Sequence, residues 1–193
     1  LPDMTARILI DAARELSAAV DALPFAPPVT HVYNPLDYAW EVHRRYLERY
    51  GDGRRRVVFV GMNPGPFGMA QIGVPFGEIA SARDWLGLEG AVGQPRTVNP
   101  KRPVEGFACT RSEISGQRLW GLFRARYGAP EAFFAEHFVA NYCPLVFFEG
   151  GRNLTPDKLP MAEQRPLLAA CDAHLRALVG APPPAWVIGI GHR

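Results

Sequence analysis

The stretch from Val57 to Leu88 constrains the fold more than any other part of this 193-residue chain. Four β-branched and aromatic residues, 57–60, run into Gly61, and glycine or proline then recurs as far as Gly77. A short apolar run bounded by such residues predicts a strand that is buried on both faces. In open α/β sheets the loop after such a strand lies at its carboxyl end, where ligands bind. The stretch therefore predicts a ligand-binding loop that follows a central strand.

Three side chains in this loop are candidates for ligand contact. Asn63 follows the strand directly and could aim its amide at a ligand or a water molecule. Met69 would form a soft wall, and Phe76 lies between Pro75 and Gly77 with little sequence around it to bury it. For each residue taken singly, an ordinary strand-to-helix turn is the alternative. The loop sequence as a whole favours a binding loop, because Asn-Pro-Gly-Pro followed by a Phe between proline and glycine is a poor way to build a simple turn.

The rest of the chain alternates predicted helices and strands. We expect helices over residues 5–23, 37–50, 115–127 and 162–179, with shorter helical turns at 81–86, 130–138 and after Thr155. We expect strands at 57–60, at 138–148 with an interruption over 141–144, and at 186–191, the last also buried. Such alternation predicts right-handed crossovers and an α/β fold: a three-layer α/β/α arrangement with a central, mostly parallel sheet. We expect residues 1–193 to form a single domain.

Composition excludes several classes of protein. The chain is 48% hydrophobic and 21% charged, and no apolar run reaches the ~20 residues of a membrane span. Its net charge of +2 does not by itself argue for nucleic acid. Cys109, Cys143 and Cys171 are far apart and odd in number, which argues for a reducing compartment and against disulfides, a zinc site or a four-cysteine iron–sulfur cluster. We therefore expect no metal, no organic cofactor and no membrane partner.

Four segments of the chain resemble one known family. GMNPGPFGMAQIGVPFGE, residues 61–78, is similar to the first active-site motif of the single-strand-selective monofunctional uracil-DNA glycosylases, a branch of the uracil-DNA glycosylase superfamily. Residues 100–124, 138–148 and 151–160 also resemble that family, in the same order. The resemblance runs from about the first predicted strand to the end of the chain and implies the same α/β/α architecture. It also implies a cytoplasmic protein, nucleoid-associated in a bacterium or nuclear in a eukaryote.

The resemblance implies that a flipped uracil is held by two side chains. An enzyme that acts on a base in DNA turns the nucleotide out of the stack and reads the base edge by hydrogen bonds. The amide of Asn141 can pair with both N3–H and O4 of uracil, and cytosine presents the opposite pattern there. Phe76 would stack on the base face, while Gly65 and Met69 would line the edge near the 5-position. The alternative for Asn141 is a strand-terminal residue that satisfies backbone groups.

The expected reaction is hydrolysis of the N-glycosidic bond of uracil, in single- and double-stranded DNA, with tolerance of 5-substituted uracil left open. The family pattern implies that Asn63 positions the catalytic water and that the backbone amide of Met62 lies near a base carbonyl. A neutral amide is a feeble general base, so most of the acceleration would come from stabilising the departing base as an anion. No lysine lies in the motif to form a Schiff base, so strand cleavage by the same enzyme is not expected.

Basic and polar residues downstream are the candidates for DNA contact. In the family, the segment that matches residues 150–165 lies against DNA. The candidates are Lys101, Arg102, Gly151, Arg152, Asn153, Thr155, Lys158 and Arg165. By themselves these charges fit a solvated face better than a DNA-binding surface. The expected partner is uracil-containing DNA, bound by a monomer.

One family motif has no match in this chain. The family's His-Pro-Ser-Pro segment supplies a histidine donor to the base and a neighbouring loop that wedges into the duplex, and it follows the third strand and a further helix. His192 is not that histidine, and the other four histidines match no motif and are expected at the surface or in the core. We therefore expect a C-terminally truncated chain that lacks the last strand and helix. If the working protein is truncated in this way, we expect little or no excision activity.

Other functions remain open. A chain without the catalytic histidine could be a non-catalytic or weakly active module that binds damaged bases or DNA. A glycosylase directed at mismatched uracil or at deaminated purines is a second alternative, and a nucleoside-handling α/β domain is a third. Binding of uracil-containing DNA without release of the base would favour the first, and a panel of damaged bases would distinguish the second.

Overall fold

Two three-stranded sheets organise the computed structural model, which describes residues 4–180 and 183–191. The parallel sheet has the order β3-β2-β6, formed by His137–Asn141, Val57–Gly61 and Trp186–Ile190. The antiparallel sheet has the order β1-β4-β5, formed by His31–Tyr33, Val146–Glu149 and Arg152–Leu154. The predicted α/β class is confirmed, and the antiparallel sheet is a feature that the sequence did not predict.

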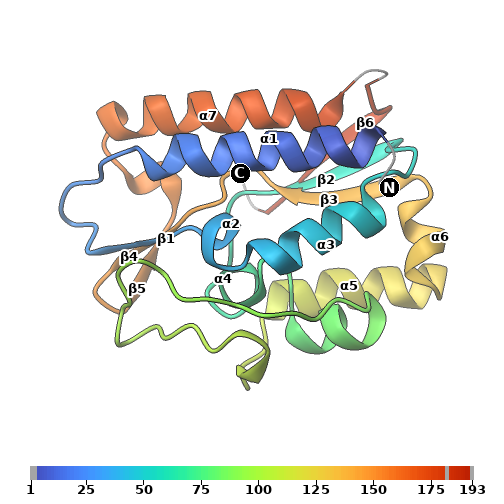
Figure 1. The fold of residues 1–193 in the computed structure, drawn as a ribbon, viewed down its shortest axis with the longest axis horizontal. Coiled ribbons are helices and arrows are strands. Elements are labelled where there is room, and N and C mark those ends of the chain that lie inside the picture. Colours follow the sequence, from blue (N-terminus) through green and yellow to red (C-terminus); the bar gives the residue numbers. More distant parts are fainter. Residues whose placement is uncertain (1–3, 181–182, 192–193) are drawn as a thin grey trace.

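Helices cover both faces of the parallel sheet. In Figure 1, α1 (Met4–Asp21) and α7 (Met161–Val179) lie side by side on one face, and α5 (Ile114–Tyr127) lies on the other. The short α6 (Pro130–Phe134) follows α5. The other helical segments are α2 (Pro35–Tyr38), α3 (Trp40–Tyr50), α4 (Met69–Ile72), a π-helix at Ser81–Trp85, and 3-10 turns at Gly106–Ala108 and Pro156–Lys158.

The register of the parallel sheet decides which way the site residues point. Phe59 of β2 packs against Phe123 of α5, with ring centroids 5.1 Å apart. Successive residues of a strand point to opposite faces, so Gly61, two residues beyond Phe59, faces the α5 side as well. Gly61 pairs with Asn141 across the β2–β3 ladder. Asn141 is therefore on the same face, at the carboxyl end of β3.

The strand predicted over residues 138–148 is two strands in two different sheets. After β3 ends, residues 142–145 carry the chain out of the parallel sheet and into β4 of the antiparallel sheet. The backbone N–H of Tyr142 still donates to the carbonyl of Gly61 over 2.8 Å, and that of Cys143 to Met62 over 2.9 Å. The predicted interruption is thus the junction between the two sheets.

Two expectations of burial are wrong. Within β2 only Val58 and Gly61 are buried, and the other three residues are half-buried. In β6, Trp186, Val187 and Ile188 are 65%, 51% and 42% exposed. Among the described strands β6 pairs with β2 alone, which makes it an edge strand. An apolar run predicts a strand, but it does not distinguish a central position in the sheet from an edge position.

Candidate functional site

Two asparagines lie at the carboxyl ends of neighbouring parallel strands. Asn141 is the last residue of β3, and Asn63 follows the end of β2. The side-chain Nδ2 of Asn63 donates to the carbonyl oxygen of Leu145 over 3.1 Å, at the junction between the sheets. This bond orients the amide and leaves its Oδ1 to accept a hydrogen bond from a water molecule or a ligand.

The ring of Phe76 and the amide of Asn141 meet over Gly61. A Cβ atom placed on Gly61 would lie 2.5 Å from Oδ1 of Asn141 and 2.5 Å from Cζ of Phe76. A side chain at position 61 would therefore collide with both groups, and this close approach requires glycine. The structure thus brings the predicted stacking ring and the predicted base-reading amide to one place, at the end of β2.

Phe76 has a backbone conformation that is rare for a residue with a side chain. Its φ of +53° lies in the left-handed region, which usually favours glycine. Its carbonyl oxygen accepts two hydrogen bonds, one from the backbone N–H of Glu78 over 2.8 Å and one from Nε1 of Trp120 over 3.0 Å. Trp120 belongs to α5 and is 1% exposed. Strained backbone of this kind persists where surrounding groups fix it, and it is common at ligand sites.

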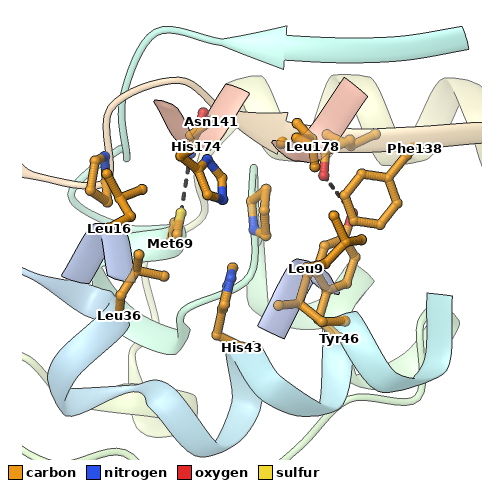
Figure 2. Close-up of a pocket in the computed structure, with 15 residues that line it drawn as sticks. Leu9, Leu16, Leu36, His43, Tyr46, Met69, Phe138, Asn141, His174 and Leu178 are labelled. Atoms are coloured by element: carbon orange, nitrogen blue, oxygen red, sulfur yellow. Dashed lines mark hydrogen bonds between the residues drawn. The ribbon is translucent and has the colours of Figure 1, made fainter. Parts of the chain in front are cut away.

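Met69 sets the orientation of the Asn141 side chain. Asn141 is buried, and its Nδ2 lies 3.2 Å from the sulfur of Met69, a contact drawn in Figure 2. A thioether is a weak acceptor. The contact nevertheless turns Nδ2 towards Met69, while Oδ1 lies beside the Phe76 ring. The site therefore presents an acceptor oxygen next to an aromatic ring.

A small interior cavity of about 20 Å³ lies next to Asn141 and Met69. His43 of α3 and His174 of α7 point into it, as Figure 2 shows. Nδ1 of His43 lies 2.8 Å from the carbonyl oxygen of Gly73 and therefore donates to it. Burial lowers the pKa of His43 to about 4, and burial also lowers the pKa of His174 to about 4. Both rings are neutral at pH 7, so neither supplies a positive charge to the site.

Glu113 supports the turn that follows Asn63. Its Oε2 accepts a hydrogen bond from the backbone N–H of Phe67 over 3.1 Å. A Cβ atom on Gly65, the residue predicted to line the base edge, would collide with Oε2 of Glu113, so a side chain there would displace this carboxylate. Met62 has a side chain that is 41% exposed. The roles predicted for Met62, Gly65 and Met69 towards a base stay predictions.

The described residues show neither a metal centre nor a membrane helix. No three of their His, Cys, Asp or Glu side chains are grouped so as to hold a metal ion. None of the described helices has the length and apolar character to cross a membrane. Cys109, Cys143 and Cys171 are free thiols, and all three are buried.

Comparison with known proteins connects these features to a family. No protein-family model matches the chain. The chain is 52% identical over 177 residues to the single-strand selective monofunctional uracil-DNA glycosylase of Rattus norvegicus, which covers 91% of it. Identity is also 52% to the proteins of the same name from Mus musculus, over 177 residues, and Bos taurus, over 170 residues. This chain is a relative of the single-strand-selective monofunctional uracil-DNA glycosylases. It spans 62–64% of the length of these three proteins.

A solved structure shares the fold of this uracil-DNA glycosylase relative. Wild-type SMUG2 of Pedobacter heparinus matches with a TM-score of 0.59, over 94% of this chain and 86% of that chain. The two sequences are 15% identical, so the likeness concerns the fold alone.

Some of the residues predicted to contact DNA lie next to one another in this glycosylase relative. Nε of Arg102 donates to the carbonyl oxygen of Gly151 over 2.8 Å, and the side chain of Lys101 packs against Gly151. Nδ2 of Asn99 donates to the Gly150 carbonyl over 2.6 Å. The long loop at 87–113 and the turn between β4 and β5 therefore form one surface.

The other predicted DNA contacts are arranged differently. Arg152 forms an ion pair with Glu149, and neighbouring Asn153 is exposed on β5. Thr155 and Lys158 both interact with Asp157, the lysine over 3.2 Å. Arg165 lies exposed on α7. Exposed pairs of this kind exchange partners readily, since they contribute little stability.

Sequence reasoning missed several residues that shape the site. Trp120 lies in the helix predicted over residues 115–127, and nothing in the sequence indicates that its indole N–H binds the carbonyl of Phe76. Glu113 follows an irregular loop and carries no motif, so nothing in the sequence indicated that its carboxylate reaches Gly65. His192, which sequence reasoning separated from the family's catalytic histidine, lies outside the described residues.

Proposed function

We propose that this protein hydrolyses the N-glycosidic bond of uracil in DNA, as its relatives are named for doing. The observation that carries the proposal is the meeting of Phe76 and Asn141 over Gly61. A base turned out of the stack needs an aromatic face to lie on and hydrogen-bonding groups along its edge. These two side chains offer both within one small region, at the carboxyl end of a parallel sheet.

The Asn141 amide would select uracil through its orientation. Its Oδ1, beside the Phe76 ring, would accept the N3–H of uracil, and its second Nδ2 hydrogen would donate to O4. Cytosine carries an acceptor at N3 and a donor at the 4-position. The same amide would then face two mismatched groups, and unmade hydrogen bonds in a desolvated site are costly.

Asn63 would position the water that attacks the sugar. Its Nδ2 is committed to the Leu145 carbonyl, so its Oδ1 is the atom that would accept a hydrogen bond from that water. An amide cannot usefully take up the water's proton. The proposed mechanism therefore places most of the acceleration in the departure of the base as an anion, with the backbone N–H of Met62 as one proposed donor to a base carbonyl.

We also propose that DNA is the partner, that the uracil nucleotide is flipped out of the stack, and that one copy of the protein acts alone. The proposed location is the cytoplasm, at the nucleoid in a bacterium, or the nucleus in a eukaryote. Three buried free thiols are in keeping with such a reducing compartment.

Base release from a labelled single-stranded oligonucleotide with one uracil tests the proposal. Alkali then cleaves the strand at each abasic site that the protein has made. We expect release by the unmodified protein, and a loss of about a hundredfold or more in Asn63→Ala and Asn141→Ala. Gln117→Ala, which removes an exposed amide from α5, is the matched control and should release uracil normally. Release of hypoxanthine or xanthine but not uracil would contradict the proposed substrate.

One observation favours a second candidate, a module that binds damaged bases without releasing them. His43 and His174 are neutral and face the interior cavity. Nδ1 of His137 donates to the Phe133 carbonyl oxygen, and Nδ1 of His31 is hydrogen-bonded to the Thr30 hydroxyl, so none of the four described histidines is placed to stabilise the departing base. Tight binding of uracil-containing DNA over thymine-containing DNA, without any release, would identify this function.

A further inference from the structure

Two arginines lie against the ring of Phe67, in the loop between Asn63 and Phe76. The guanidinium carbon of Arg111 is 3.8 Å from the ring centroid, and that of Arg102 is 5.5 Å away. Residues 103–110 separate the two arginines in the sequence, and no sequence pattern predicts that both lie against one ring. Phe67 itself is half-buried and packs against the main core cluster, so the ring is a fixed support.

Stacking of this kind prepares an arginine to bind phosphate. A guanidinium that lies on an aromatic face keeps its N–H groups at the edge free to donate, and it loses less freedom when it binds. Among the described ion pairs, Arg152, Lys158 and Arg96 have acidic partners, whereas Arg102 and Arg111 enter none. The Phe67 ring thus carries two cationic groups whose charge is not balanced by an ion pair.

The position of this group relative to the candidate base site is set by hydrogen bonds. The N–H of Phe67 is bound by Glu113, which directly precedes α5. The same helix provides Trp120, which holds the Phe76 carbonyl. On the other side, Arg102 is bound to the Gly151 carbonyl. The group formed by Phe67, Arg102 and Arg111 is therefore connected through Glu113 and α5 to the residue that holds Phe76, and through Arg102 to the loop surface around Gly151.

We propose that Arg111 and Arg102, supported by Phe67, bind the backbone phosphates of single-stranded DNA next to the flipped nucleotide. The inference rests on the proposed action on DNA and extends it by assigning Arg111 and Phe67, for which the sequence predicts no DNA contact. Phosphate contacts hold a strand in place without reading its sequence. The group would thus fix the strand while the base is read by Asn141.

Salt dependence of binding tests the proposal without requiring base release. The probe is a fluorescent single-stranded oligonucleotide without uracil, titrated by anisotropy at several salt concentrations. Each phosphate contact on a single strand contributes about 0.7 to the slope of log K against log salt. We expect Arg111→Gln to lower that slope by about 0.7 and to weaken binding at low salt by roughly fivefold to tenfold. Arg7→Gln makes the same change in charge at an exposed position of α1 and should leave the slope unchanged.

Two further variants separate stacking from charge. Arg111→Lys keeps the charge but not the flat stacking, so it should keep the slope and lose affinity by roughly threefold. Phe67→Leu removes the support and should also weaken binding at nearly constant slope. Thermal unfolding of each variant checks that the fold is retained.

The outcomes distinguish this inference from the proposed function. If Arg111→Gln and Arg7→Gln give the same slope, the phosphate site is overturned, whether or not the protein releases uracil. If the slope falls as expected while no uracil is released, the phosphate site stands and the proposed reaction falls. If the unmodified protein does not bind the uracil-free probe at all, the phosphate site is overturned, and the base-release assay decides the proposed reaction separately.

Discussion

The indole Nε1 of Trp120 donates to the carbonyl oxygen of Phe76 over 3.0 Å. Phe76 is the one non-glycine residue with a left-handed backbone in the described part of the chain. A helix on one face of the parallel sheet thereby holds the loop residue whose ring lies over Gly61. The position of the ring depends on the packing of α5 as much as on the loop.

Removing this donor should disturb the site more than the fold. Trp120→Phe keeps an aromatic ring in the core but leaves the Phe76 carbonyl with only the Glu78 N–H. We expect a loss of about 1–2 kcal/mol in unfolding free energy and a tenfold or greater loss of uracil release. Trp85→Phe is the control, because it removes an indole donor to the Gly128 carbonyl that is 2.7 Å long. If the two variants lose release equally, the bond to Phe76 has no special role.

A single methyl group at position 61 should block the site. In Gly61→Ala the added carbon would meet Asn141 Oδ1 and the Phe76 ring at about 2.5 Å, so at least one of them must move. We expect binding of uracil-containing DNA and release of uracil to fall by about a hundredfold or more. Gly121→Ala, on an exposed side of α5 with nothing within 4 Å, should release uracil normally and gain up to about 1 kcal/mol in stability. Normal release by Gly61→Ala would contradict the geometry of the site.

The protein should lose stability as the pH falls from about 6.5 towards 4. His43 titrates near 6.5 when unfolded, and burial lowers its pKa to about 4 in the folded protein. Between these values the unfolded state binds more protons, so acid favours unfolding, and the full stability is present above about 6.5. For one such histidine the loss of unfolding free energy reaches about 3 kcal/mol at a pH below both pKa values.

Urea unfolding at pH 7 and pH 5 measures this dependence. His174→Gln removes the second ring that lines the cavity, whose pKa is also about 4, and should flatten the change in urea midpoint between the two pH values. His31→Gln, at the half-buried β1 position, should leave the change as it is. An unaltered pH dependence in His174→Gln would show that this ring does not titrate as its burial implies.

The three cysteines should react slowly with thiol reagents in the native protein. Burial raises the pKa of the Cys109 thiol, and a hydrogen bond to Cys143 together with burial raises that of Cys171. Because the thiolate is the reactive form, we expect labelling by a chromogenic disulfide at pH 8 to be more than about tenfold slower than in urea. Labelling of all three thiols at the unfolded rate would contradict the buried arrangement.

The sequence predicted much of the fold because the relevant signals are local. The apolar run before Gly61 predicted β2, and the glycines and prolines that follow it predicted an irregular loop at the strand's carboxyl end. The predicted interruption over residues 141–144 likewise placed Asn141 at the end of a strand. Whether these side chains meet depends on the register of β2 and β3. The pairing of Gly61 with Asn141 joins residues far apart in the sequence, so no single segment predicts it.

Other features were beyond local reasoning. The antiparallel sheet combines β1, β4 and β5 from distant parts of the chain, and two of these strands are only three residues long. The exposure of Trp186 depends on the edge position of β6, which its apolar sequence does not indicate. Glu113 reaches Gly65 through folding of a long loop without periodic pattern, so its contact could not be predicted from spacing.

The passage of the chain from one sheet to the other at residues 142–145 has a consequence for how the site fails on warming. Asn141 ends the parallel sheet, whereas Asn63 is tied to Leu145 at the entrance to the small antiparallel sheet. The distance between the two amides therefore depends on how the two sheets are positioned relative to each other. A small shift of the antiparallel sheet would misalign the proposed water and base positions while the hydrogen bonds of the parallel sheet stayed intact. The proposed activity would then be lost at temperatures where the protein is still folded.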